Sequence, residues 1–236
     1  MFTLLPTNGE KIATNSMVIP SFTEENYLKM IYAIASRQQG EVTTNALAEM
    51  TATRAASVTD MLKRLADKGL IHYKRYQGVR LTEEGERLAL TIIRRHRLWE
   101  VFLVDKLGFG WDQVHEMAEE LEHVRSDELM KRLDAFLNYP QFDPHGDPIP
   151  TPAGLMPAVT YRKLADLAPL EEACLMGVLD HSAAFLQHLD ACGLTLGSVV
   201  KVSEISPFDR SMHVTIAPNQ ALFVSYDVAK NLLVSQ

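Results

Sequence analysis

Histidine and carboxylate side chains are concentrated in residues 115–123, HEMAEELEH, a stretch without proline or glycine. At about 100° per residue, an α-helix over this stretch places four of them on one side: His115, Glu119, Glu122 and His123. An earlier pair, His96 and Glu100, has the i, i+4 spacing of helical neighbours. Imidazole and carboxylate groups on facing helices are how a helical core holds a first-row divalent metal ion. The sequence therefore predicts a metal site between two helices.

Two other interpretations of these residues remain open. Histidine–glutamate pairs at this spacing also occur on solvated helix faces without any ligand. The same groups could form a di-metal hydrolase or oxidase, although no further base or nucleophile stands in a defined motif.

Length and composition indicate an ordinary globular protein of two or three domains, because the chain has 236 residues. Its two cysteines, Cys174 and Cys192, make neither a disulfide framework nor a cysteine metal motif, which fits a reducing cytoplasm. Glu10 and Lys11 are the only charges in the first twenty residues, and no apolar core follows, so we expect no signal peptide. No apolar run is long enough to span a bilayer, and we expect a cytoplasmic protein without a membrane partner.

The net charge of −7 is unevenly distributed along the chain. Residues 21–84 carry nine Lys/Arg and eight Asp/Glu, or +1, whereas residues 85–157 carry eight and thirteen, or −5. Residues 158–236 carry five and eight, or −3. The acidity therefore lies away from the N-terminal third, and bound divalent cations would offset much of the central excess.

Residues 21–84 have the pattern of a winged helix-turn-helix. A first helix begins at Thr23 and ends near Gly40, and short helices follow over 46–50 and 55–66. Strand-like runs at 70–76 and 79–82 flank Gln77-Gly78, a hairpin signal, and such a hairpin after two short helices is a wing.

This pattern predicts contacts with double-stranded DNA. The third helix would offer Arg54, Ser57, Thr59 and Asp60 to the major groove and the flanking phosphates. The wing would offer Lys74, Arg75 and Arg80 to phosphates. A simpler interpretation of Ser57 and Thr59 is that they are only solvated.

The middle of the chain predicts a helical domain over residues 85–157. A long helix from Thr82 carries His96 and Glu100, the helix of residues 115–123 follows, and another covers about 126–137. These helices have more large apolar side chains than they need to bury among themselves. We therefore expect a homodimer, whose two-fold symmetry suits a palindromic operator.

Proline- and glycine-rich residues 138–157 mark a boundary, after which the pattern changes to strands. Short strands at 199–205, 212–216 and 221–225, with a helix at 183–192, predict a small SH3-like β-barrel over 158–236. The expected fold is thus mainly α with a β domain: an extension over 1–20, a winged helix, a helical domain and a barrel.

The chain resembles the diphtheria toxin repressor family of metal-dependent transcriptional regulators. The resemblance is close over about 22–157 and looser in the barrel. It rests on residues 23–31, 46–70, 95–100, 114–128 and the Gly-Asp-Pro-Ile-Pro of 146–150. It implies a winged helix, a helical dimerisation and metal domain, and an SH3-like domain akin to ferrous transport protein A.

The resemblance also implies two metal sites. One would use His96, Glu100 and His115, with help from the barrel, where His181 is the candidate. The other would use Glu119, Glu122 and His123 with a residue beside Tyr27 on the first helix. That residue is Asn26, in place of the family's methionine or aspartate, and it offers at most a neutral carbonyl oxygen. Lys29 replaces a carboxylate that some manganese-responsive members use.

The metal expected from these residues is Mn²⁺, with one or two ions per protomer. Glu119 stands where the iron-responsive branch has cysteine and the manganese-responsive branch has glutamate, a hard oxygen ligand. The expected function is a homodimeric, manganese-responsive repressor of metal-uptake genes that binds a palindromic operator. The alternatives are a response to Fe²⁺, the di-metal enzyme, and a transport-associated adaptor that uses the barrel.

Overall fold

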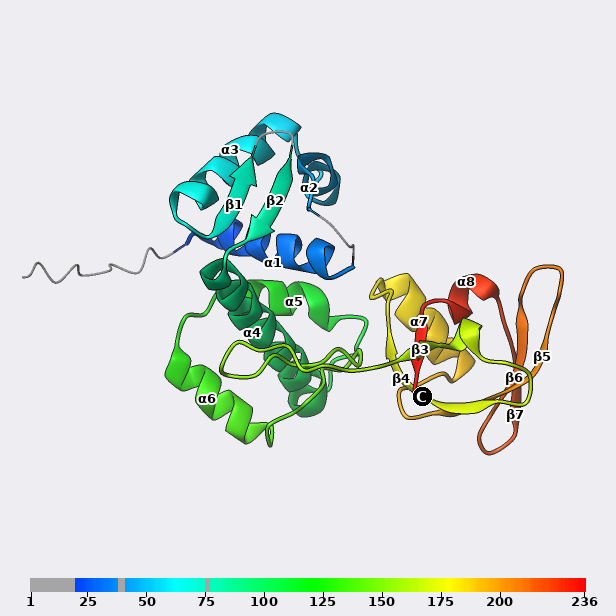
Figure 1. Cartoon of the computed structure of the whole chain (residues 1–236). Coiled ribbons are helices and arrows are strands. Elements are labelled where there is room, and N and C mark those ends of the chain that lie inside the picture. Colours follow the sequence, from blue (N-terminus) through cyan, green and yellow to red (C-terminus); the bar gives the residue numbers. More distant parts are fainter. Residues whose placement is uncertain (1–19, 38–40, 75–76) are drawn as a thin grey trace, which may run out of the picture.

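The computed structural model describes residues 20–37, 41–74 and 77–236, which form three parts in chain order (Figure 1). A winged helix-turn-helix comes first, a helical part follows, and a β-rich part ends the chain. This arrangement confirms the predicted fold class. The extension expected over residues 1–20 lies outside the described residues, apart from Pro20, and so does Arg75.

The winged part is built from three helices and a hairpin. Its elements are α1 (Phe22–Arg37), α2 (Thr44–Met50), α3 (Ala55–Asp67), β1 (Ile71–Lys74) and β2 (Gly78–Leu81). Thr43 starts α2 because its hydroxyl accepts a hydrogen bond from the Ala46 amide at 3.1 Å. Leu28, Leu47 and Leu62 are fully buried where the three helices meet.

The long helix α4 (Glu83–Leu107) leads from the wing into the helical part. The Thr82 hydroxyl accepts from the Gly85 amide at 3.1 Å, and Gly108 ends the helix with φ +73°. A Cβ on Gly85 would lie 1.9 Å from the Leu70 carbonyl oxygen. Only glycine permits this approach, which fixes the start of α4 against the base of the hairpin.

Two short helices complete the helical part: α5 (Val114–Leu121) and α6 (Asp127–Phe136). The helix predicted over 115–123 ends earlier than expected, with Glu122 at its C-cap and His123 in the following turn. His123 therefore does not share the face of His115 and Glu119. The physical reason is its environment, since the turn directs His123 toward α1, where it meets a buried carboxylate.

A proline-rich connection joins α6 to the β-rich part. The Arg97 guanidinium, on α4, lies 2.7 Å from Asp147 Oδ2 and 3.3 Å from Asp143 Oδ2, so this connection is fixed to the helical part. Gly146 has φ +88°, and a Cβ there would lie 2.1 Å from the Met176 carbonyl oxygen. The connection therefore also packs closely on a strand of the β-rich part.

The β-rich part is a six-stranded sheet with strand order β3-β8-β4-β5-β6-β7 and antiparallel pairing. Its elements are β3 (Arg162–Lys163), the 3₁₀ turn η1 (Leu164–Asp166), β4 (Glu172–Val178), α7 (Ala183–Cys192), β5 (Val199–Ile205), β6 (Met212–Ile216), β7 (Gln220–Val224), α8 (Tyr226–Ala229) and β8 (Leu232–Val234). Leu175, Leu186 and Val200 are in its buried core. In the described part of the chain, no helix is long and apolar enough to cross a membrane.

Candidate metal centre

Two helices and the proline-rich connection bring histidines and carboxylates together around Glu100, which is buried on α4. His96 stands one turn earlier, and its Nε2 lies 3.0 Å from Glu100 Oε1. His115, on α5, has its Nδ1 3.5 Å from the same oxygen. The structure therefore brings together His96, Glu100 and His115, which the family resemblance assigned to one site.

Two further residues, Asp143 and His145, join this group from the connection after α6. His145 Nε2 lies 2.8 Å from the Trp111 carbonyl oxygen, to which it must donate because a carbonyl only accepts. A neutral imidazole then carries its lone pair on Nδ1. This atom is buried without a hydrogen-bond partner, 3.8 Å from Glu100 Oε2 and 4.0 Å from Asp143 Oδ1.

We call His96, Glu100, His115, Asp143 and His145 the Glu100 cluster. A lone pair without a partner in a buried site is costly unless a cation or proton meets it. An imidazole whose other nitrogen is held by a carbonyl is the usual arrangement of a metal-ligating histidine. The cluster contains nitrogen and oxygen donors and no cysteine, so it fits a first-row divalent ion such as Mn²⁺ or Fe²⁺.

The charges inside the cluster are strongly coupled. Burial opposes the charged form of Glu100, but the neighbouring imidazoles of His115, His145 and His96 hold its pKa well below the usual value. Burial also lowers the pKa of His96, but hydrogen bonds with Glu100 and Glu122 outweigh it and raise the pKa to about 9. Without a metal, protons on histidine thus supply positive charge to these carboxylates.

Asp143 differs from Glu100 within the same cluster. Burial and the nearby negative charges of Glu100 and Asp147 raise the pKa of Asp143 to about 7. A cation bound beside these two carboxylates would favour the ionised form of both.

Two carboxylates beside this cluster, those of Glu119 and Glu122, both contact the ammonium group of one lysine. We call these two residues the Glu119–Glu122 pair. Lys29, on α1, has its Nζ 2.7 Å from Glu122 Oε2 and in contact with Glu119 Oε1. Glu122 Oε2 also lies 2.7 Å from His96 Nδ1. His115 Nε2 is 3.8 Å from Glu119 Oε1. The pair is therefore near the Glu100 cluster but already faces an ammonium group.

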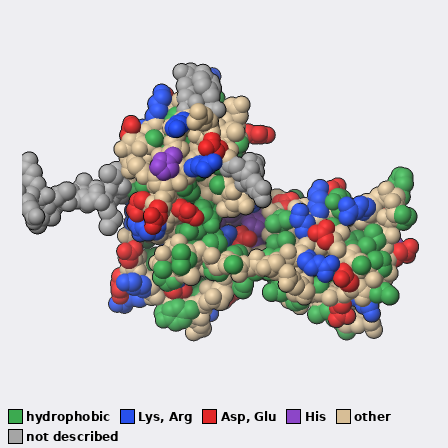
Figure 2. Space-filling view, viewed as in Figure 1, with side chains coloured by type: hydrophobic (Ala, Val, Ile, Leu, Met, Phe, Trp, Pro, Cys, Tyr) green, Lys and Arg blue, Asp and Glu red, His purple; other side chains and the backbone are tan. Residues whose placement is uncertain are grey.

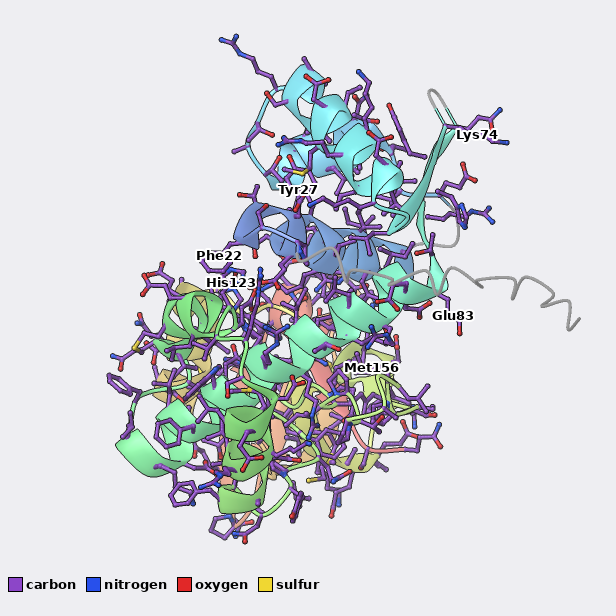
Figure 3. All side chains as sticks on the ribbon, turned by 90° about the vertical axis from the view of Figure 1, so that its left-hand side faces the viewer. Phe22, Tyr27, Lys74, Glu83, His123 and Met156 are labelled. Carbon is purple, nitrogen blue, oxygen red and sulfur yellow. The ribbon has the colours of Figure 1, made fainter. Side chains whose placement is uncertain are left out.

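Of the remaining residues predicted for the second site, His123 lies apart from this pair, whereas Asn26 lines a cavity together with Glu119. His123 Nδ1 is 2.6 Å from Glu25 Oε2, and its ring stacks on Phe22 with centroids 4.4 Å apart. Figure 3 shows Phe22 and His123 next to each other. Among the described residues, His123 belongs to none of the groups whose ligand atoms lie within 4.8 Å of one another. Asn26 Oδ1 is buried without a hydrogen-bond partner, in a cavity that Lys29 and Glu119 also line.

His181, the predicted contribution of the barrel, stacks on His145 with ring centroids 4.7 Å apart. Its Nε2 lies 3.3 Å from the Val178 carbonyl oxygen. Burial and the neighbouring His145 lower the pKa of His181, which keeps its imidazole neutral. His181 therefore lies next to the Glu100 cluster, although its atoms belong to none of the groups that could share one ion. Figure 2 shows histidine and acidic side chains at the notch between the helical and β-rich parts.

The predicted DNA-binding residues that the structure describes lie at α3 and in the wing, and Ser57 lines the same cavity as Lys29 and Glu119. Arg54 precedes α3, and Ser57 and Asp60 are exposed on it. Thr59 lines a groove formed with α2 and the wing, and its hydroxyl donates to the Ala55 carbonyl at 2.9 Å.

Lys74 is exposed at the end of β1, far from His123 in Figure 3. Arg80, on β2, lies 3.1 Å from Glu41 Oε1 and remains mostly exposed. Lys63 lines the same groove as Thr59 and was missed, although its position one turn after Thr59 on the third helix could have indicated it.

Comparison with known proteins gives three consecutive matches. Residues 21–79 match the N-terminal DNA-binding domain of iron-dependent repressors, and residues 82–151 match their metal-binding and dimerisation domain. Residues 162–236 match the FeoA domain. A solved manganese-dependent transcriptional repressor in complex with manganese is 35% identical, with a TM-score of 0.81 over 90% of this chain and 99% of that chain. This chain belongs to the diphtheria toxin repressor family.

Two curated relatives show the range of this similarity. The iron-dependent repressor IdeR of Mycobacterium tuberculosis is 36% identical over 129 residues, which are 54% of this chain and 55% of that protein. An uncharacterised helix-turn-helix regulator of Methanocaldococcus jannaschii is 35% identical over 113 residues, 48% of this chain and 90% of that protein. The match with IdeR thus spans about half the length of that protein. The first relative is a repressor and the second is a transcriptional regulator.

The sequence analysis did not predict the roles of four residues around this centre: Asp143, His145, Glu25 and Lys29. For Lys29, the role that was not predicted is its contact with the two carboxylates. Asp143 and His145 stand among turn-forming residues, which favoured interpreting them as a linker. A histidine between two aspartates in Asp-Pro-His-Gly-Asp-Pro was the available signal. Glu25 gave none, because a carboxylate in the first turn of a helix has an ordinary explanation in the helix dipole.

Proposed function

We propose that the protein is a homodimeric, metal-dependent DNA-binding repressor that responds to Mn²⁺ and controls metal-uptake genes. The observation that carries this proposal is the buried, unpartnered His145 Nδ1 beside Glu100 and Asp143, in a chain whose first part is a winged helix. A divalent cation would supply the positive charge that this cluster takes from protonated histidines without it.

The ligand chemistry favours Mn²⁺ over Fe²⁺. Oxygen donors come from Glu100 and Asp143, and both cysteines, Cys174 and Cys192, lie in the β-rich part outside the cluster. Carboxylates without thiolates suit Mn²⁺, whereas affinity alone would favour the metals later in the Irving–Williams order. Of the predicted ligands, we retain His96, Glu100 and His115 for this site, with His181 as a neighbour.

A hydrogen-bonded path connects this cluster to the DNA-binding part. His96 bridges Glu100 and Glu122 with its two nitrogens, at 3.0 and 2.7 Å. Glu122 in turn contacts Lys29, on α1. Recruitment of His96 as a ligand therefore changes the partner of a carboxylate that holds α1. A coupling of about 1–3 kcal/mol changes operator affinity about 5–150-fold.

The test is fluorescence anisotropy on a DNA fragment from upstream of the protein's own gene. Chelator, Mn²⁺ and Fe²⁺ are compared under anaerobic conditions at one fixed salt concentration, because salt alone changes DNA affinity strongly. Tight binding with Mn²⁺ and weak binding with chelator are expected. Tight binding with Fe²⁺ alone would replace the metal in this proposal, and metal-independent affinity would contradict it.

A further inference from the structure

We propose that the Lys29 ammonium is the permanent cation of the Glu119–Glu122 pair, so that this pair takes up no divalent ion and metal binds only in the Glu100 cluster. This inference rests on the proposed function and specifies where its metal binds. It departs from the two metal sites that the family resemblance implied for these residues.

The first support is the geometry of the lysine. Its Nζ lies 2.7 and 2.9 Å from the two carboxylate oxygens of Glu122 and contacts Glu119 as well. The Lys29 side chain is 17% exposed and that of Glu122 is fully buried, so the contact is shielded from solvent. Breaking such a pair leaves an uncompensated buried charge, which is strongly unfavourable.

The second support is the incompatibility of this lysine with a divalent ion. A cation that bound both carboxylates would have to share them with the ammonium or displace it. Two positive charges about 4 Å apart repel even in a polar environment. Displacement would also separate α1 from the Glu122 carboxylate, within 4 Å of which the described residues place no other lysine or arginine nitrogen.

The third support is that the other ligands such a site would need are engaged elsewhere. His96 can join Glu119 and Glu122 with ligand atoms within 4.8 Å of one another, but its Nε2 lies 3.0 Å from Glu100 Oε1, so it belongs to the Glu100 cluster as well. His123 is held by Glu25, whose second oxygen lies 3.2 Å from Arg125 Nε. Asn26 is neutral, and its oxygen cannot replace a carboxylate's charge. Two carboxylates with a lysine between them are an ion-pair network, not an open coordination site.

The Glu100 cluster differs from this pair because its carboxylates meet imidazoles and no lysine among the described residues. Within the described residues, the basic groups within 4 Å of Glu100 are three imidazoles, of His96, His115 and His145. A neutral imidazole has a nitrogen lone pair that can bind a metal, whereas a lysine ammonium has three donors and no lone pair. His115 is 52% exposed, which leaves this cluster open to an entering ion.

The experiment counts bound Mn²⁺ per protomer by equilibrium dialysis of metal-free full-length protein. Wild type is compared with Lys29→Arg, which keeps the cation, and with Lys29→Glu and Lys29→Gln, which remove it. Lys201→Glu is the charge-matched control, since Lys201 is exposed on β5, away from both groups of carboxylates. Lys29→Gln removes the cation without adding repulsion, and so remains informative should Lys29→Glu fail to fold.

We expect each folded variant without the cation, Lys29→Glu and Lys29→Gln, to bind one more ion per protomer than wild type does. Lys29→Arg and Lys201→Glu should bind the same number of ions as wild type. Equal, non-zero counts in all five proteins would overturn the role of Lys29 and leave the proposed function standing. No binding by wild type, with one ion bound by Lys29→Glu, would support the role of Lys29 and overturn the proposed function. An absence of binding in every protein would overturn both.

Discussion

His145 shows how one side chain can define a metal site that its sequence context conceals. Its Nε2 is held by the Trp111 carbonyl, which orients Nδ1 toward Glu100 and Asp143. The imidazole plane is fixed further by two stacked rings: that of His181, and that of Trp111, whose centroid is 6.1 Å away. His145 is therefore positioned before any ligand arrives, which lowers the entropic cost of binding.

Replacing His145 by alanine should weaken Mn²⁺ binding by at least about tenfold, the smaller effect reported for groups that only support a ligand. Equilibrium dialysis on the full-length protein measures this change directly. His213→Ala is the control, because His213 is exposed on β6, and it should bind Mn²⁺ as wild type does. An unchanged affinity in His145→Ala would remove His145 from the site.

Metal binding should depend on pH through His96. Its pKa of about 9 lies above the ordinary 6.5, so the metal-free protein carries this proton at neutral pH and must release it when His96 becomes a ligand. Mn²⁺ affinity should therefore rise about tenfold per pH unit for each proton released, and level off above about pH 9. Calorimetry at pH 7.5 in buffers of different ionisation enthalpy should detect at least about one proton released per ion; a value of zero would contradict this prediction.

At the scale of single elements, α1 belongs to two sites at once. Its upper face packs on α3 through Tyr27, while Phe22 and Lys29 contact residues at the end of α5 (Figure 3). A small displacement of α1 would therefore reach both the recognition helix and the Glu119–Glu122 pair. This shared helix is the structural basis on which metal state and DNA affinity can be coupled.

The wing, formed by β1 and β2, should contribute charge but no sequence preference. Lys74→Ala should weaken DNA binding to specific and unrelated sequences alike, and reduce the slope of log affinity against log salt by about 1. Anisotropy titrations at several salt concentrations measure both quantities. Lys201→Ala, in the β-rich part, should leave the slope unchanged. A loss confined to the specific sequence would instead assign Lys74 a contact with bases.

At the scale of the whole molecule, an apolar surface on the helical part is left exposed by the described residues. Phe136 is 59% exposed and Tyr139 is 63% exposed, near the end of α6. Phe136 continues an aromatic row with Phe102 and Trp99, from α4. Exposed aromatic side chains beside a buried core are typical of an interface between protomers. We expect this surface to form the homodimer.

Phe136→Asp should weaken that dimer by about 30-fold or more, because a charge placed in an apolar interface costs about 2 kcal/mol or more. Light scattering after size-exclusion chromatography measures the change, and operator affinity should fall with it. Phe208→Asp is the matched control, since Phe208 is 96% exposed in the β-rich part. A Phe136→Asp protein that remains a dimer would place the interface elsewhere.

The sequence by itself determined the order of the elements and most of their ends. Thr43, Thr82 and Ser126 were readable as helix starts, and each hydroxyl does accept a hydrogen bond from an amide of the first turn. Alternating apolar residues likewise located β5 and β6. These features follow from interactions between residues that are close in the chain, which is why periodicity and capping suffice to predict them.

The composition of the metal centre depended on contacts that the chain order does not show. Spacing correctly grouped His96 with Glu100, yet it could not bring Asp143 and His145 to them, because these contacts cross about forty residues. Nor could it direct His123 to Glu25, or Lys29 to the Glu119–Glu122 pair, since both contacts join α1 to the end of α5. Only the packing of the three parts decides which cation each buried carboxylate meets, because electrostatic partners are selected by distance in space.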